Sequence, residues 1–123
     1  IAYNILFDLS FLQALFRKYL SPTFTIKNDI LDVMAVYKDR HRYPHRLDQA
    51  VETYHVQVKN THRALDDIKA TYEALIKMND ELPNVNHYVN KIGFNPKYGV
   101  KFKLPHVTYI AQYGGRREIE KSR

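Results

Sequence analysis

The chain has 123 residues, 45% of them hydrophobic and 26% charged, so it is long enough to bury one core and is not expected to be disordered. Its 19 Lys and Arg outnumber 13 Asp and Glu, giving a net charge of +6 that favours a polyanionic partner such as nucleic acid, an anionic membrane surface or an acidic protein. The absence of cysteine excludes disulfides, thiolate metal sites and cysteine catalysis. The basic residues are interpreted as spread along the chain, without marking one binding face.

No apolar run approaches the roughly 20 residues that a membrane-spanning helix needs. The opening residues 1–7 are apolar, but they lack the basic region and the cleavage site of a signal peptide. We therefore expect no membrane partner and a cytoplasmic location. Because the sequence opens inside an apolar run without Met, we expect further residues to precede it in the whole protein.

Three helices are expected in the first part of the chain. Residues 1–3 should end a strand, and apolar side chains at helical spacing predict a helix over about residues 7–20. The apolar stripe of that helix is predicted to be Leu12, Leu15, Phe16 and Tyr19. A second helix is predicted over about residues 29–39 with Asn28 or Asp29 as its cap, and a short third helix over 47–54. The basic connection 40–46 either contacts phosphates or is a solvated loop.

The clearest helical pattern covers about residues 64–79. Its predicted apolar stripe is Leu65, Ile68, Tyr72, Leu75 and Ile76, and Pro83 lies beyond its end. Residues 84–99 are rich in Asn, Gly, Pro and Tyr and are predicted to be irregular, whereas residues 107–111 are typical of a strand. The organisation expected is a first part over 1–82 and an irregular or extended C-terminal extension over 83–123.

His62 and Asp67 stand at the start of this helical pattern. Residues five apart on a helix differ by about 140° around its axis, so the two side chains converge only if His62 lies in the preceding loop. An imidazole beside a metal-binding carboxylate is suited to activating water for phosphodiester hydrolysis. The chain has six His, so a His five residues before an Asp can also occur by chance, and His62 can equally be an ordinary loop residue.

Longer motifs surround these residues. Residues 2–12, AYNILFDLSFL, match A-[HY]-N-x-x-F-D-x-x-F-L at every defining position, and residues 62–71, HRALDDIKAT, match H-R-A-x-x-D-A-x-A-T except at Ile68. Between them, residues 28–33 and 45–50 are similar to a D-T-L helix start and an H-x-L-x-x-L helix. Through these four motifs, residues 1–80 resemble the DnaQ-like (DEDDh) 3′–5′ exonucleases, the family of the DNA polymerase III epsilon subunit.

The resemblance implies an α/β, RNase H-like exonuclease fold that is helix-rich and N-terminally incomplete. The family's first motif, D-x-E on the first strand, is not found before the second motif here. We expect a preceding segment to supply the first three strands and two carboxylates, and residues 1–123 alone to be inactive. Residues 102–112 resemble the segment that follows the exonuclease insert of PolC-type polymerases, but they fit a C-terminal extension of a stand-alone exonuclease equally well.

The resemblance also implies a site of two Mg²⁺ or Mn²⁺ ions held by carboxylates, with a histidine as general base. Carried over by position, Asp8 and Asp67 are the metal ligands and His62 is the base. Asn4, Leu9 and Phe11 are the substrate-positioning candidates, with core packing as the default for the last two. The implied activity is 3′–5′ hydrolysis at single-stranded DNA 3′ ends in proofreading or repair, with a replicative polymerase as a candidate partner.

Two alternatives stay open from the sequence. One is a 3′–5′ exoribonuclease, since no residue distinguishes ribose from deoxyribose. The other is a non-catalytic nucleic-acid-binding or scaffolding module that keeps the exonuclease fold. The oligomeric state is not predicted.

Overall fold

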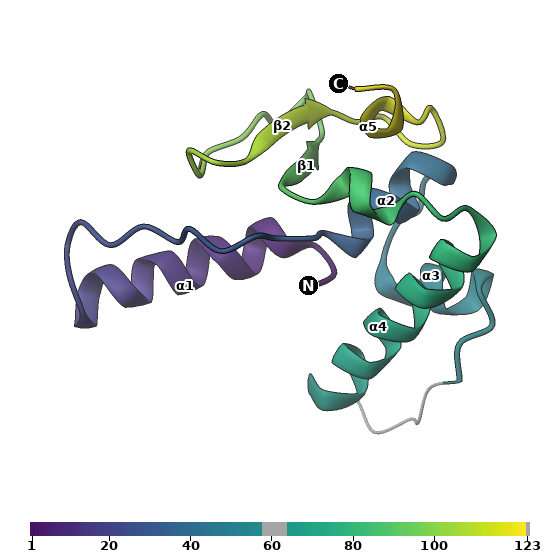
Figure 1. Cartoon of the computed structure of the whole chain (residues 1–123), viewed down its shortest axis with the longest axis horizontal. Coiled ribbons are helices and arrows are strands. Elements are labelled where there is room, and N and C mark those ends of the chain that lie inside the picture. The colour runs from purple at the N-terminus through teal and green to yellow at the C-terminus, as the bar shows by residue number, and fades with distance from the viewer. Residues whose placement is uncertain (58–63, 123) are drawn as a thin grey trace.

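The computed structural model describes residues 1–57 and 64–122, and it combines helices with one small parallel sheet (Figure 1). The elements in chain order are α1 (Ile5–Tyr19), α2 (Val33–Arg40), α3 (Leu47–Thr53), α4 (Ala64–Glu81), the 3-10 helix η1 (Val85–Tyr88), β1 (Lys91–Phe94), β2 (Thr108–Ala111) and α5 (Glu118–Lys121). Among the described residues, no helix is both long enough and apolar enough to cross a membrane.

The four predicted helices are present, but the second begins later than predicted. The cap is Asp32 rather than Asn28 or Asp29, and its side chain accepts a hydrogen bond from the backbone N–H of Met34. Residues 28–31 are extended or bent instead, and Ala2 pairs with Asp32 in an isolated parallel bridge. All three acidic or amide residues are good helix caps, so the sequence pattern left the starting residue open.

The buried face of α1 differs from the predicted stripe. Ile5, Leu9 and Gln13 are buried, whereas Leu12 and Leu15 are each 39% exposed and Tyr19 is 69% exposed. Gln13 can be buried because its amide donates to the carbonyl of Phe24 and its carbonyl accepts from the N–H of Ile26. Both faces of α1 carry apolar residues, so periodicity alone selected the wrong one.

The buried face of α4 is also displaced from the predicted stripe. Of the predicted residues, Leu75 is buried, but Ile68, Tyr72 and Ile76 are exposed. The residues that pack inward are small or flexible, and they are Ala70, Thr71, Ala74, Leu75 and Met78. Small side chains let α4 lie close to α2 and α3, which leaves the larger apolar residues facing outward.

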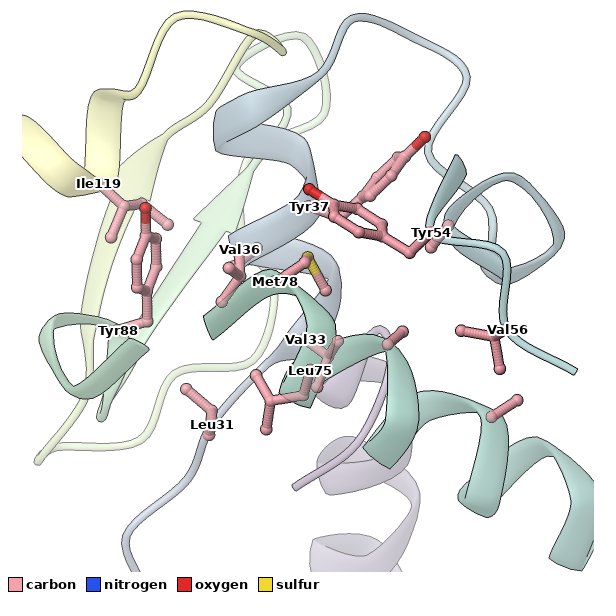
Figure 2. Packing of buried hydrophobic residues seen from close by; sticks show 14 residues of the cluster. Leu31, Val33, Val36, Tyr37, Tyr54, Val56, Leu75, Met78, Tyr88 and Ile119 are labelled. Carbon is pink, nitrogen blue, oxygen red and sulfur yellow. The ribbon is translucent and has the colours of Figure 1, made fainter. Parts of the chain in front are cut away.

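The main core lies between α2, α3 and α4 and includes two residues from the end of the chain (Figure 2). Val33, Val36 and Met78 are fully buried there, and Tyr88 from η1 and Ile119 from α5 complete it. A second cluster joins α1 to the extended segment 24–31 and to β1 and the β1–β2 connection; its members are Ile5, Leu9, Ile26, Ile30, Ile92, Leu104 and Val107. Residues before and after position 82 therefore pack together in both clusters. The division of the chain into parts 1–82 and 83–123 stays a prediction that concerns which residues resemble the exonuclease family.

Residues 84–99 are predicted to be irregular, but they contain η1 and β1. Strand β1 pairs in parallel with β2, the strand that the sequence does predict, with Ile92 opposite Tyr109. Gly93 is required because a Cβ there would lie 1.9 Å from the side-chain oxygen of Gln112. A four-residue strand containing glycine has little periodicity of its own, and it forms because a distant partner supplies its hydrogen bonds.

Asp39, near the end of α2, joins the helical core to the C-terminal part of the chain. Its buried carboxylate accepts hydrogen bonds from the Tyr88 hydroxyl at 2.9 Å and the Gln112 amide at 2.6 Å. It also accepts from the backbone N–H groups of Ile119 and Glu120 at 3.2 and 2.8 Å. One side chain thus satisfies four donors contributed by three separate segments.

Replacing Asp39 should unfold the protein more easily than replacing an exposed acid. Asp39→Ala leaves three buried donors and one partly buried donor without the acceptor they share, so we expect the free energy of unfolding to fall by about 3 kcal/mol or more. Asp80→Ala, at an exposed position of α4, should change it by less than about 0.5 kcal/mol. Urea unfolding followed by circular dichroism measures both, and equal effects would contradict the role given to Asp39.

Candidate active site

The first turn of α1 and the first turn of α4 contribute to one open hollow of about 570 Å³. We name it the carboxylate hollow; it is lined by Ile1, Ala2, Tyr3, Asp8, Leu47, Asp67, Ile68, Thr71 and Tyr72. Asp8 and Asp67 are both exposed there. The structure therefore brings two of the three predicted chemical residues, which are far apart in the sequence, to the same cavity.

Asp32 fixes the start of α1 and so the position of Asp8. One oxygen of the Asp32 carboxylate accepts from the backbone N–H groups of Asn4 at 2.9 Å, Ile5 at 3.3 Å and Met34 at 3.1 Å. The N-termini of α1 and α2, each with a partial positive charge, therefore meet at one anion. The backbone bonds of the Ala2 bridge, from Ala2 N–H to Leu31 and from Val33 N–H to Ala2, hold the same junction.

Burial raises the pKa of Asp32 from 3.8 to about 6, even though the three N–H donors favour the charged form. The nearby charge of Asp8 acts in the same direction as burial. The group that orients α1 is therefore an acid that holds its proton more tightly in the folded protein than in the unfolded chain.

Asp67 is positioned by the packing and the C-terminal anchoring of α4. Arg40, whose side chain is only 5% exposed, donates to the carbonyl groups of Met78 and Leu82 near the end of α4. Its guanidinium also donates to Asn84 at 2.7 Å, so it caps the helix with several bonds. Within the basic connection 40–46, Arg40 is thus structural, while Arg42 and Arg46 are exposed.

The residues present suit a hard divalent cation in part. Asp8 and Asp67 supply carboxylate oxygens, the ligands that Mg²⁺ and Mn²⁺ prefer. Across residues 1–57 and 64–122, however, no three His, Asp or Glu side chains gather closely enough to hold an ion among themselves. The two carboxylates are therefore half of the ligand set that the family resemblance implies.

The other predicted site residues have different positions. His62 lies outside the described residues, directly before α4. Asn4 is exposed and caps α1 in the left-handed conformation, with φ of 62°. Phe11 is 67% exposed, whereas Leu9 is buried in the second cluster, so any influence of Leu9 on a substrate would be indirect.

Seven of the nine residues that line the hollow are absent from the predicted site, and three of them carry large side chains of interest. Tyr3 lines it and donates a hydrogen bond from its hydroxyl to the carbonyl of His45, and burial raises the pKa of that hydroxyl. Ile68 and Tyr72 are 65% and 55% exposed on the α4 side. Tyr3 could have been predicted as a site residue, because it occupies the His-or-Tyr position of the motif over residues 2–12. Ile68 and Tyr72 could not, because their helical spacing also predicts core residues.

The α/β fold and the motif residues place this chain in an exonuclease family, as the comparisons with known proteins show. The exonuclease (RNase_T) family model matches residues 1–75, and the chain belongs to this DnaQ-like exonuclease family. It is 32% identical over 122 residues to a PolC-type DNA polymerase III of Caldanaerobacter subterraneus, covering 91% of this chain and 8% of that protein. It is 26% identical over 113 residues to the 3′–5′ exonuclease DinG of Staphylococcus epidermidis, covering 89% of this chain and 12% of that protein.

A PolC-type DNA polymerase III of Bacillus subtilis matches more narrowly, with 32% identity over 82 residues. That match covers 63% of this chain and 6% of the relative, so the chain spans only a small part of each of these proteins. The comparison with solved structures gives no match.

The raised pKa of Asp32 predicts that the stability of the protein depends on pH. The native state binds the Asp32 proton more tightly, so the stability contributed by this group is full below pH 3.8 and is lost as pH rises through about 6. Asp32→Asn keeps a carbonyl acceptor but does not titrate. The native chain should therefore lose stability relative to this variant as the pH rises. Between about pH 4 and 7 the loss in its free energy of unfolding should be on the order of 3 kcal/mol.

Urea unfolding of both proteins across this pH range measures the difference. Titrating groups remote from Asp32 contribute equally to both proteins and cancel. A difference that stays constant with pH would show that Asp32 has the same pKa in the folded and unfolded states.

Proposed function

We propose that this chain forms part of a metal-dependent 3′–5′ exonuclease that hydrolyses phosphodiester bonds at single-stranded DNA 3′ ends. The observation that carries the proposal is the shared hollow of Asp8 and Asp67, because each carboxylate is the metal-ligand position of a separate family motif. The names of the relatives, DNA polymerase III and 3′–5′ exonuclease, support DNA as the substrate and this polarity. They also make a replicative polymerase the favoured partner.

In this proposal Asp8 and Asp67 hold Mg²⁺ or Mn²⁺ together with carboxylates from elsewhere in the protein. Bound ions of this kind lower the pKa of water and neutralise the charge that develops on a phosphate. Both carboxylates project from the first turns of helices, so the backbone keeps them fixed while the substrate enters.

His62 is proposed to accept the proton of the attacking water. A neutral imidazole with an ordinary pKa near 6.5 can do so at physiological pH. Attack on the terminal phosphodiester breaks the bond between phosphorus and the 3′ oxygen, which leaves a 3′ hydroxyl on the strand and releases a nucleotide with a 5′ phosphate. Exposed Asn4 and Phe11, at the start and the outer face of α1, are the positioning candidates beside the terminal nucleotide.

The test is hydrolysis of a 5′-labelled single-stranded DNA oligonucleotide by the full-length protein with Mg²⁺ or Mn²⁺. Asp67→Ala and His62→Ala should each lower the rate by roughly 10²–10⁴-fold, since a ligand or a general base is lost. Asp66→Asn is the matched control, because Asp66 is the adjacent acid and does not line the hollow. It should retain nearly full activity.

Unchanged rates in both Asp67→Ala and His62→Ala would contradict the site. A full-length protein that binds the oligonucleotide without hydrolysing it would favour the non-catalytic module instead. An RNA oligonucleotide of the same sequence, run in parallel, decides between the two sugars.

A further inference from the structure

The net charge of the chain is concentrated in one segment, contrary to the expectation that it is spread. Residues 82–117 contain six Lys and Arg and no Asp or Glu. Residues 1–81 carry eleven basic and eleven acidic side chains, and residues 118–123 carry two of each. The whole charge of +6 therefore comes from the segment that forms η1, β1, β2 and the connections around them.

Part of this segment lines a groove against α1. The groove has a volume of about 360 Å³ and is bounded on the α1 side by Asn4, Phe7 and Ser10. On the other side it is bounded by Tyr98, Lys101 and Phe102 of the β1–β2 connection. We call it the lysine groove.

The lysine groove opens beside the carboxylate hollow. Asn4 and Phe7 line the groove, and their immediate neighbours Tyr3 and Asp8 line the hollow. Both cavities therefore lie at the N-terminal end of α1, and the side chains of Asn4, Phe7 and Asp8 between them are exposed. A chain-like ligand whose end lies in the hollow could continue into the groove without crossing the core.

The groove offers the two kinds of contact that a single nucleic-acid strand needs. Tyr98 is 72% exposed and Phe7 is 73% exposed, so each presents an aromatic surface on which a base can stack. Lys101 is exposed at the groove, and Lys97 and Lys103 are exposed on the same connection. The Lys97 ammonium lies 5.6 Å from the centre of the Tyr98 ring, so charge and aromatic surface are side by side.

The connection that carries these residues is anchored. The backbone N–H of Leu104 donates to the Tyr109 hydroxyl at 2.6 Å, and Leu104 and Val107 are buried in the second cluster. Phe102 packs against the same cluster. Lys101 and Tyr98 therefore lie between strand β1 and these anchors on the C-terminal side, which reduces the entropy lost on binding.

We propose that the lysine groove binds the single-stranded nucleic acid that leads to the 3′ terminus, with Tyr98 stacking on a base and Lys101 contacting a phosphate. This inference rests on the proposed function, because it places the terminal nucleotide in the carboxylate hollow. A third hollow, lined by Tyr3, Asn4, Met34, Tyr43, His45, Arg46 and Leu47, shares Tyr3 and Leu47 with the carboxylate hollow. It offers one strongly exposed aromatic side chain, Tyr43, whereas the lysine groove offers two, Phe7 and Tyr98. The lysines of residues 82–117 also have no acidic residue in their own segment, so we favour the lysine groove.

The test is the binding of a fluorescent oligothymidylate to the chain by anisotropy, in EDTA so that no hydrolysis takes place. Tyr98→Ala should raise the Kd about fivefold or more through lost stacking. Lys101→Ala should also raise it and should reduce the slope of log Kd against log salt by about 0.7, the value for one phosphate contact on a single strand. Lys121→Ala, an exposed lysine on α5 that does not line the groove, is the matched control and should leave the slope unchanged.

Equal weakening by Lys101→Ala and Lys121→Ala would overturn the proposal, because net charge alone would then explain binding. So would a native chain that does not bind the oligonucleotide, or that binds anionic lipid vesicles with the same dependence on Tyr98 and Lys101. These measurements do not need catalysis. Groove-dependent binding with no hydrolysis by the full-length protein would overturn the proposed function and support the groove.

Discussion

The carboxylate of Asp32 is the constraint on which the arrangement of the site depends. It is buried where the N-termini of α1 and α2 meet, and it accepts backbone N–H groups from both helices. Without this anion two partly positive helix ends would face each other with unsatisfied donors. Because α1 begins at this junction, Asp8 in its first turn lines the carboxylate hollow together with Ala2 and Tyr3 and with the first turns of α4.

A second buried carboxylate, that of Asp39, joins the C-terminal part of the chain to the helical core. Asp39 ties η1, β2 and α5 to α2, and Arg40 beside it anchors the end of α4. The C-terminal forty residues are therefore built into both hydrophobic clusters. This is why the basic β1–β2 connection has a fixed position against α1. The second hydrophobic cluster holds the connection that presents Tyr98 and Lys101 in the groove beside the first turns of α1.

Large apolar side chains remain exposed on α1 and α4. Ile1, Ile68 and Tyr72 are exposed at the carboxylate hollow, and Phe7 and Phe11 are exposed on α1. Periodicity treats such residues as core, since it detects an apolar face but not the partner that covers it. The face that packs within this chain uses Ala70, Ala74 and Gln13, which carry a weaker hydrophobic signal. The sequence therefore predicts that α1 and α4 are helices with apolar faces, but it does not predict which face of each helix is buried.

The sequence by itself determined the family, the presence and order of the four main helices, and Asp8 and Asp67 as the carboxylates of interest. Motif residues and helical spacing are local properties, so they can be read along the chain. Only the tertiary structure decided that the two carboxylates line one hollow, that β1 exists, and that Asp32 and Asp39 are buried acceptors. Each depends on groups distant in sequence, because a buried carboxylate or a short strand is stable only when other segments complete its hydrogen bonds.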